Sequence, residues 1–227
     1  MGMSERKEKE RDRRRNEIIE AAESLFFEKG YDHATMDEIA KKSELTKRTI
    51  YTYFSSKEEL QYEIMLRGFE KLNQLIDGKL SDETLDPAFQ DSGIEKIKLL
   101  GHAFMAFSIK YPYYFRTIMN YENQELELQQ STKSELISRF YAAGQYSMDL
   151  LERFILEGIA QDEIIKSSDP KILSLVLWSS MTGLLGLLRK KEKYIAGYFN
   201  ENTSLVLAEG FKIIVNSIKK EKVDSNV

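Results

Sequence analysis

Apolar residues recur at helical spacing along most of the chain, and no stretch alternates between apolar and polar residues in the manner of a strand. Near the N-terminus this spacing predicts a helix over residues 16–29, which Gly30 is suited to end. Thr35 and Glu38 have the spacing of a capping box, so a second helix should follow them. Thr46 can cap a third, short helix over residues 47–53. Three short amphipathic helices of this kind can bury one small core.

The remainder of the chain predicts a larger helical body. Asp169 and Pro170 have the cap-then-first-turn pattern of a helix start, and the helix that follows them is apolar on almost every side. A loop is expected at residues 81–93, where proline and glycine occur among acids. The predicted helices of this body span about residues 56–80, 94–110, 125–157, 170–188 and 202–219, with a short helix that begins at Pro112. The predicted fold class is therefore all-α.

The stretch from Lys41 to Lys57 concentrates basic and hydroxyl side chains in and around the third helix. Ile50 and Phe54 lie four residues apart and can anchor this helix to a core, which leaves Lys47, Arg48 and Thr52 pointing outward. Cations, hydroxyls and phenols without a carboxylate suit the edges of bases and the phosphates of nucleic acid. A solvated basic helix on an ordinary domain is an equally good interpretation of this segment taken alone.

The residues around this stretch decide between the two interpretations. They include an aromatic pair at Phe26 and Phe27, the triplets Lys29-Gly30-Tyr31 and Ala34-Thr35-Met36, and the runs Ile50–Phe54 and Lys57–Leu60. With these residues, the segment from about residue 15 to residue 60 resembles the N-terminal domain of the TetR family of bacterial transcriptional regulators. That family commonly has glycine where this chain has Glu44 in the turn and Asp162 in the body, so both residues are candidates for a positive φ.

The resemblance implies a three-helix helix-turn-helix DNA-binding domain at residues 13–56 and a larger helical ligand-binding and dimerisation domain at residues 57–220. Residues 1–12 alternate in charge and should be disordered or a frayed helical tail. The arginines that end this tail can reach DNA phosphates, although a solubilising role is as good an interpretation. The predicted DNA-contacting residues are Arg14, Thr35, Thr46, Lys47, Arg48, Thr49, Tyr51, Thr52, Tyr53 and Lys57.

The implied function is that of a homodimeric, ligand-responsive regulator, a repressor that leaves a palindromic double-stranded operator when a small-molecule effector binds. The aromatic residues of the body suggest a hydrophobic or aromatic ligand, although such residues at helical spacing more often only fill a core. The predicted pocket consists of Phe69, His102, Phe104, Tyr111, Phe115, Phe140, Tyr141 and Trp178. The dimer interface, through the last two long helices, is predicted to include Trp178, Met181, Gly183, Leu184, Leu188, Phe211 and Ile214.

Composition mainly excludes other classes of function. The net charge of −4 does not exclude a DNA-binding protein, because such a protein needs only a local basic face. With no cysteine, two isolated histidines, no glycine-rich phosphate loop and no nucleophile elbow, we expect no enzyme, cofactor or metal site. No signal-peptide pattern and no uninterrupted apolar run long enough for a membrane span is present, so a soluble, cytoplasmic protein is expected. A helical protein-interaction module without ligand response is the alternative.

Overall fold

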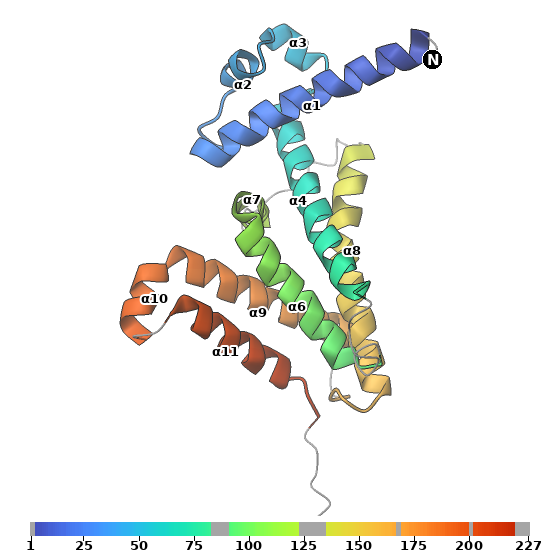
Figure 1. Ribbon diagram of the computed structural model, residues 1–227, viewed down its shortest axis with the longest axis vertical. Coiled ribbons are helices and arrows are strands. Elements are labelled where there is room, and N and C mark those ends of the chain that lie inside the picture. Colours follow the sequence, from blue (N-terminus) through green and yellow to red (C-terminus); the bar gives the residue numbers. More distant parts are fainter. Residues whose placement is uncertain (1–2, 83–90, 123–134, 167–168, 200–201, 221–227) are drawn as a thin grey trace, which may run out of the picture. The chain divides into compact units, whose positions relative to one another are not determined.

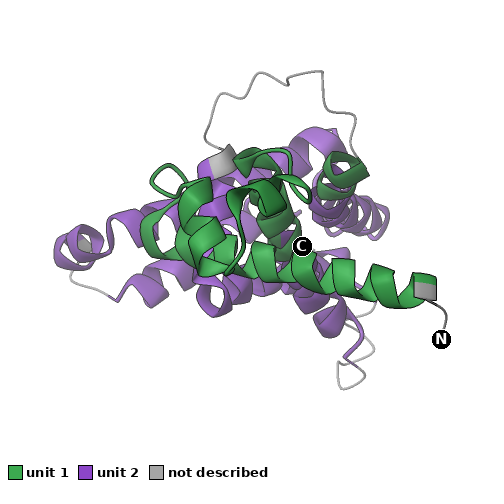
Figure 2. Ribbon diagram, turned by 90° about the horizontal axis from the view of Figure 1, so that it is seen from above, with its two compact units in different colours: residues 1–68, 126–140 green, residues 69–125, 141–227 purple. Residues whose placement is uncertain are grey.

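The computed structural model describes residues 3–82, 91–122, 135–166, 169–199 and 202–220. Every regular element in these ranges is a helix, apart from one isolated bridge between Ile164 and Lys219, which confirms the predicted all-α class. Two compact units are present (Figure 2). Unit 1 comprises residues 1–68 and 126–140, and unit 2 comprises residues 69–125 and 141–227.

Unit 1 contains α1 (Met3–Lys29), α2 (Met36–Lys42), α3 (Lys47–Tyr51) and the first part of α4 (Lys57–Leu80) (Figure 1). Its core is apolar and draws on all four helices through the fully buried residues Ile18, Ile19, Ile39, Ile50, Phe54, Leu60 and Ile64. The predicted start of the first helix at residue 16 was too late, because α1 begins at Met3. Helix α4 runs without a break to Leu80 and so contributes to both units.

Among the described residues, three take a positive φ, and each lies directly after or close to a helix end. Gly30, with φ 87°, donates its amide to the carbonyl of Phe26 at 3.0 Å and ends α1 as predicted. Glu44 has φ 56° in the turn between α2 and α3, and Asp162 has φ 61° just after α8. Glycine is common in the family at both of these positions, and a positive φ was expected for that reason. Both non-glycine residues do occupy the left-handed conformation.

Unit 2 contains the rest of α4 and, in the described ranges, six further helices. Their bounds are α6 (Gly93–Lys110), α7 (Pro112–Glu122), α8 (Glu135–Ala160), α9 (Pro170–Lys190), α10 (Glu192–Phe199) and α11 (Thr203–Asn216). The first residues of α8 belong to unit 1. The predicted start of the long helix at residue 125 lies outside the described residues, and α10 was not predicted. Phe107, Phe115, Phe154 and Ile155 are almost fully buried in the core of this unit.

Helix α9 has a buried side and an apolar exposed side. Asp169 caps it by accepting a hydrogen bond from the amide of Lys171 at 2.8 Å, and Pro170 occupies its first turn, as predicted. Leu173, Leu177, Met181, Leu185 and Leu188 are buried, whereas Ile172, Leu175, Val176 and Leu187 are each at least half exposed. By length and composition α9 could cross a membrane, a test that the core helix of a soluble protein also passes.

Candidate nucleic-acid interface

Helix α2 is fixed at its start by the predicted capping box. The amide of Glu38 donates to the hydroxyl of Thr35 at 3.3 Å, and the amide of Thr35 donates to the Glu38 carboxylate at 3.0 Å. The Glu38 carboxylate also pairs with the ammonium group of Lys29 at the end of α1. Hydrogen bonds from Lys29 and then from Thr35 lower the pKa of Glu38 to about 2. The carboxylate therefore stays charged and ties α2 to the end of α1.

The turn and the next cap set the direction of α3. The amide of Leu45 donates to the carbonyl of Ala40 at 3.0 Å, which closes the turn around Glu44. The hydroxyl of Thr46 then accepts from the amide of Thr49 at 3.1 Å, which confirms Thr46 as the N-cap of α3. Ile50 and Phe54 have no exposed surface, so the opposite side of this short helix is presented to solvent.

The exposed side of α3 carries cations, hydroxyls and a phenol. Lys47, Arg48, Tyr51 and Thr52 are exposed, and no acidic residue occurs between Glu44 and Glu58. The hydroxyl of Thr52 donates to the carbonyl of Thr49 at 2.7 Å. These side chains offer strong hydrogen-bond donors to a negatively charged partner. Their helix is held by the N-cap at its start and by the buried side chains of Ile50 and Phe54. The structure thus brings together most of the predicted DNA-contacting residues.

The two predicted contact lysines are already engaged within unit 1. The ammonium group of Lys47 pairs with Asp37 of α2 at 2.9 Å, and this hydrogen bond raises the pKa of Lys47. The ammonium group of Lys57 donates to the carbonyls of Tyr31 and Ala34 at 3.0 and 3.1 Å and lies 4.2 Å from the centre of the Tyr31 ring. Lys57 therefore clamps the loop before α2 to the start of α4, a long-range contact that no local pattern indicates.

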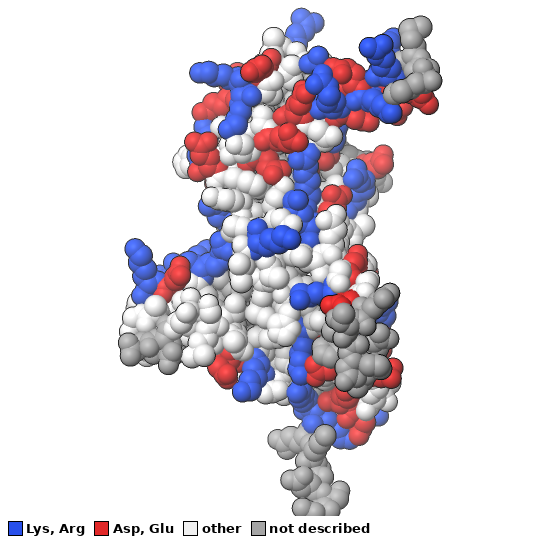
Figure 3. Space-filling view, viewed as in Figure 1, with Lys and Arg blue, Asp and Glu red and all other residues white. Residues whose placement is uncertain are grey.

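Arg14 lies on α1 rather than in a flexible tail. Its guanidinium pairs with Glu10 at 3.1 Å, and the neighbouring Arg13 pairs with Glu10 and Glu17, both at 2.8 Å. Over the face of unit 1 in view, Lys and Arg side chains are interspersed with Asp and Glu side chains (Figure 3). Positive charge on unit 1 is therefore local, and α3 is a short helix on which cations occur without carboxylates.

The segment that builds this interface also carries the match to known proteins. The sequence profile described as "Bacterial regulatory proteins, tetR family" matches residues 18–64, which run from the middle of α1 through α3 into α4. Over these residues the chain is similar to the tetR family. The shared segment includes the two caps, the turn and the buried anchors Ile50 and Phe54, so the helix-turn-helix assignment and the family match rest on the same residues.

Two curated proteins resemble this chain over its N-terminal part. The HTH-type transcriptional activator FasR of Mycolicibacterium smegmatis is 40% identical over 62 residues, which are 27% of this chain and 28% of that protein. The biofilm operon icaADBC HTH-type negative transcriptional regulator IcaR of Staphylococcus aureus strain Newman is 35% identical over 78 residues, 34% of this chain and 42% of that protein. The chain thus matches less than half of the length of either relative.

A solved structure extends the likeness of fold to nearly the whole chain. The TetR family transcriptional regulator PfmR from Thermus thermophilus superposes with a TM-score of 0.61 over 88% of this chain and 97% of its own length. The two sequences are 21% identical, so this comparison bears on the fold alone. It supports the assignment of an N-terminal helix-turn-helix followed by a helical body.

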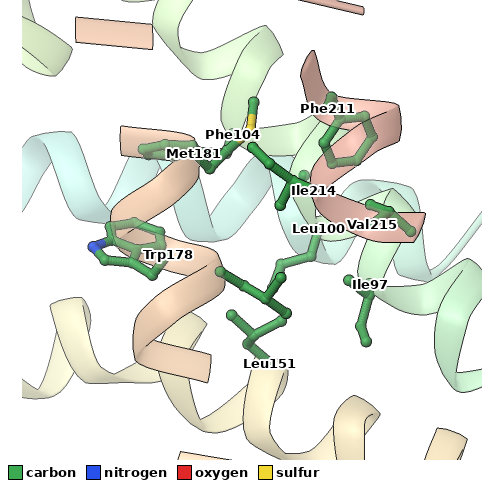
Figure 4. Close-up of a pocket in the computed structure, with 11 residues that line it drawn as sticks. Ile97, Leu100, Phe104, Leu151, Trp178, Met181, Phe211, Ile214 and Val215 are labelled. Atoms are coloured by element: carbon green, nitrogen blue, oxygen red, sulfur yellow. The ribbon is translucent and has the colours of Figure 1, made fainter. Parts of the chain in front are cut away.

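The predicted pocket residues of the body do not surround one cavity. The ring of Phe104 lies 4.6 Å from that of Trp178 and 5.7 Å from that of Phe115, so these three form one aromatic cluster in unit 2. Phe104 and Trp178 line a cavity of about 50 Å³ among α6, α8, α9 and α11, into which apolar side chains project from several sides (Figure 4). A space of this size can hold a few water molecules and is far below the roughly 300–1,000 Å³ of a typical ligand site.

The other five predicted pocket residues lie elsewhere. His102 is exposed, with its ring 5.1 Å from that of Phe211, and Tyr141 is 45% exposed. Phe69 is buried beside Gly144, and Tyr111 lies beside Phe107 with ring centres 6.0 Å apart. Phe140 belongs to unit 1, where its ring lies 5.3 Å from that of Tyr62.

A second cavity in unit 2 is much larger, at about 530 Å³, and lies between α7 and α9. Among the predicted pocket residues, Phe115 alone lines it. Its other residues, among them Arg116, Arg189 and Lys190, were missed because the sequence does not show which helices pack together. In the described ranges, no group of three histidine, aspartate or glutamate side chains is arranged to hold a metal ion.

The predicted interface residues on α9 and α11 lie largely inside unit 2. Met181, Leu188 and Phe211 are buried, and Leu184 packs toward the backbone of Gly210. Gly183 is exposed. The apolar residues that do face solvent on these two helices are Ile172, Leu175, Val176, Leu187, Leu205 and Ile213. Those at the start of α9 follow a three-to-four-residue spacing, so helical periodicity could have identified this side.

Proposed function

We propose that the protein is a DNA-binding transcriptional regulator that acts as a homodimer, and that it is a repressor released from a palindromic operator by a small ligand. The observation that carries this proposal is the exposed side of α3, where Lys47 and Arg48 project from a capped helix anchored by Ile50 and Phe54. That helix lies within the segment matched by the tetR family. An anchored helix with outward-facing donors has the form of a major-groove reader.

The proposed DNA contacts fall into two groups, those to base edges and those to phosphates. Arg48 can form a bidentate pair with guanine, and Lys47 can donate to the same base edges once it leaves Asp37. Arg14, Thr35 and Lys57 are assigned to phosphates, which supply affinity without sequence preference. The ammonium group of Lys57 has three donors, two of which bind carbonyls, so one remains for a phosphate.

Dimerisation is supported by the apolar exposed side of α9. Ile172, Leu175 and Val176 are 50–60% exposed, and burying them against a second copy removes apolar area from water. A two-fold symmetric dimer carries two copies of α3, which matches a palindromic operator with half-sites about 34–36 Å apart or at a comparable spacing. Covering α9 in this way also accounts for its apolar composition without a membrane.

The repressor assignment is supported by the IcaR relative, which is a negative transcriptional regulator. The FasR relative is described as an activator. The sign of regulation is therefore tested directly, with a reporter gene placed behind the promoter that the protein binds. Loss of the protein should raise the reporter signal, and a lowered signal would make the protein an activator.

Helix α4 is the proposed link between ligand and DNA. In unit 1 it is joined to α1 by the pair of Arg67 with Glu23 at 3.2 Å. In unit 2 it is joined to α8 by hydrogen bonds from Asn73 to the carbonyl of Ala143 at 3.0 Å and from Tyr146 to Asp77 at 2.5 Å. A ligand that displaces α4 would change the spacing of the two DNA-reading helices.

This response requires the ligand to prefer the spacing that cannot bind DNA, because equal affinity for both states shifts nothing. A coupling free energy of about 1–3 kcal/mol would weaken operator binding roughly five- to 150-fold. The test is fluorescence anisotropy of the wild-type protein on the DNA upstream of its own gene and on a scrambled duplex, at several salt concentrations. Tight binding to the first duplex alone supports the proposal, and equal binding to both contradicts it.

A further inference from the structure

The cavity between α7 and α9 is large enough for a small organic ligand and has an unusual distribution of charge. Its volume of about 530 Å³ falls in the range of roughly 300–1,000 Å³ typical of ligand sites. Phe115 and Met119 supply buried apolar surface on the α7 side. Arg116, Arg189 and Lys190 also line it, and no aspartate or glutamate is among its described lining residues. An apolar wall beside cations, with no acid in the same wall, favours a ligand that has an apolar part and an anionic part.

The Arg189 guanidinium is held against the wall of the cavity. It donates one hydrogen bond to the carbonyl of Ser108 at 2.6 Å and lies 5.6 Å from the centre of the Phe115 ring. A guanidinium has five N–H donors in a planar fork, so the Ser108 contact positions the group and leaves donors for another acceptor. Lys190, the next residue, is exposed at the end of α9 and can turn its ammonium group toward the same acceptor.

One neutral group in the wall lacks a partner. The hydroxyl oxygen of Thr182 is buried and makes no hydrogen bond to a described residue. A buried hydroxyl without a partner is unfavourable. On the same helix, a Cβ atom added at Gly183 or Gly186 would meet no atom within 4 Å, so the backbone there borders open space.

We propose that this cavity binds an anionic amphiphile: an organic acid whose apolar body lies along Phe115 and Met119 and whose anionic head binds Arg189 and Lys190, with Arg116 beside them. This inference rests on the proposed ligand-responsive function and gives the effector its chemical class. The charged head supplies charge-assisted hydrogen bonds, which are stronger than those of a neutral head. The cavity therefore discriminates by charge as well as by shape.

The test is calorimetric titration of the full-length protein, without DNA, with four probes that share one ten-carbon chain: decanoate, decyl phosphate, decan-1-ol and decylammonium. Decanoate or decyl phosphate should bind at least about tenfold more tightly than the alcohol, because hydrogen bonds to charged groups are lost in the alcohol. The comparison of the two acids shows whether a carboxylate or a phosphate head is preferred. Equal affinity for the acid and alcohol probes would overturn the proposal, as would preference for decylammonium.

Variants locate the site. Arg189→Gln combined with Lys190→Gln should weaken acid binding about tenfold or more and leave alcohol binding nearly unchanged. Gly186→Phe should fill the cavity and weaken the binding of every probe, since the added Cβ meets no atom within 4 Å. The matched control is Lys171→Gln with Lys212→Gln, which removes two exposed cations that do not line the cavity. If Arg189→Gln prevents folding, judged by circular dichroism, Arg116→Gln with Lys190→Gln replaces it.

The outcomes separate this site from the proposed function. Wild-type protein that binds its operator but gives no heat of binding with either acid probe would overturn the anionic site and leave the DNA-binding proposal standing. Acid binding that disappears in the cavity variants and persists in the control supports the site, whatever happens to operator affinity. Acid binding that is unchanged in both cavity variants would place it elsewhere and overturn the proposal.

Discussion

The ammonium group of Lys47 lies 2.9 Å from a carboxylate oxygen of Asp37, and this contact joins the first residue of α3 to the first turn of α2. The two side chains are 48% and 71% exposed, so water screens the pair and it contributes little to stability. A DNA phosphate or base edge can therefore displace Asp37 from Lys47. The pair holds Lys47 in one place before DNA arrives and opposes binding only weakly.

Replacement of this acid should strengthen binding to DNA of any sequence. Asp37→Asn removes a negative charge beside the proposed interface and releases Lys47, so affinity should rise about two- to tenfold and depend more steeply on salt. The measurement is anisotropy with a random duplex at several salt concentrations. Glu20→Gln, which neutralises an exposed carboxylate on α1, is the control. Unchanged affinity in Asp37→Asn would show that Lys47 does not approach DNA.

Lys57 should matter for stability as well as for DNA binding. Lys57→Met removes two hydrogen bonds to the carbonyls of Tyr31 and Ala34 and should lower the free energy of unfolding by about 1–3 kcal/mol. Urea denaturation followed by circular dichroism measures this loss. Lys42→Met, on the exposed surface of α2, should cost much less. If the two variants have the same urea midpoint, the clamp does not stabilise the fold.

The left-handed conformation of Glu44 should make glycine the better residue for stability. With φ at 56°, the Cβ atom of Glu44 is crowded by its own backbone, and Glu44→Gly should raise the free energy of unfolding by about 0.5–1 kcal/mol after the entropy cost of glycine. Gly30→Ala, at φ 87°, should lower it instead. Urea midpoints of the two variants test the sign, and destabilisation by Glu44→Gly would contradict the argument.

The exposed side of α9 should hold the dimer together. Val176→Glu places a charge beside Ile172 and Leu175 and should give a folded monomer that no longer binds its operator. Light scattering at micromolar concentration gives the mass. The control is Ile109→Glu on α6, since Ile109 is 74% exposed and lies outside this stripe. A stable monomer of the wild-type protein at that concentration would rule out the dimer.

Features decided by neighbouring residues could be predicted from the sequence. The caps at Thr35, Thr46 and Asp169 each need one side-chain oxygen and an amide two or three residues further on, and all three were confirmed. The positive φ of Glu44 followed from its place in a turn where glycine is common. Each of these features is local, so a short pattern contains the relevant physics.

Features that lack a strong local pattern, or that join distant residues, could not be predicted in this way. The start of α1 lacks an apolar stripe, and ion pairs such as Arg13 with Glu17 support it instead. The two hydrogen bonds of Lys57 reach carbonyls that lie 23 and 26 positions away from it along the chain. Helix α10 buries Ile195 and exposes Tyr194 and Tyr198, which gives a weak periodic signal over eight residues. The cavity between α7 and α9 depends on how those helices pack, and sequence spacing does not show that.

Two double variants, measured on the DNA upstream of the gene, test whether α3 reads a DNA sequence. Lys47→Ala with Arg48→Ala removes the proposed base contacts, and Lys166→Ala with Lys212→Ala removes two exposed cations of unit 2. Loss of a bidentate Arg48–guanine pair should cost about 1–3 kcal/mol of discrimination. Preference for the operator over a scrambled duplex should collapse in the first variant and persist in the second. Equal operator preference in both variants would contradict this.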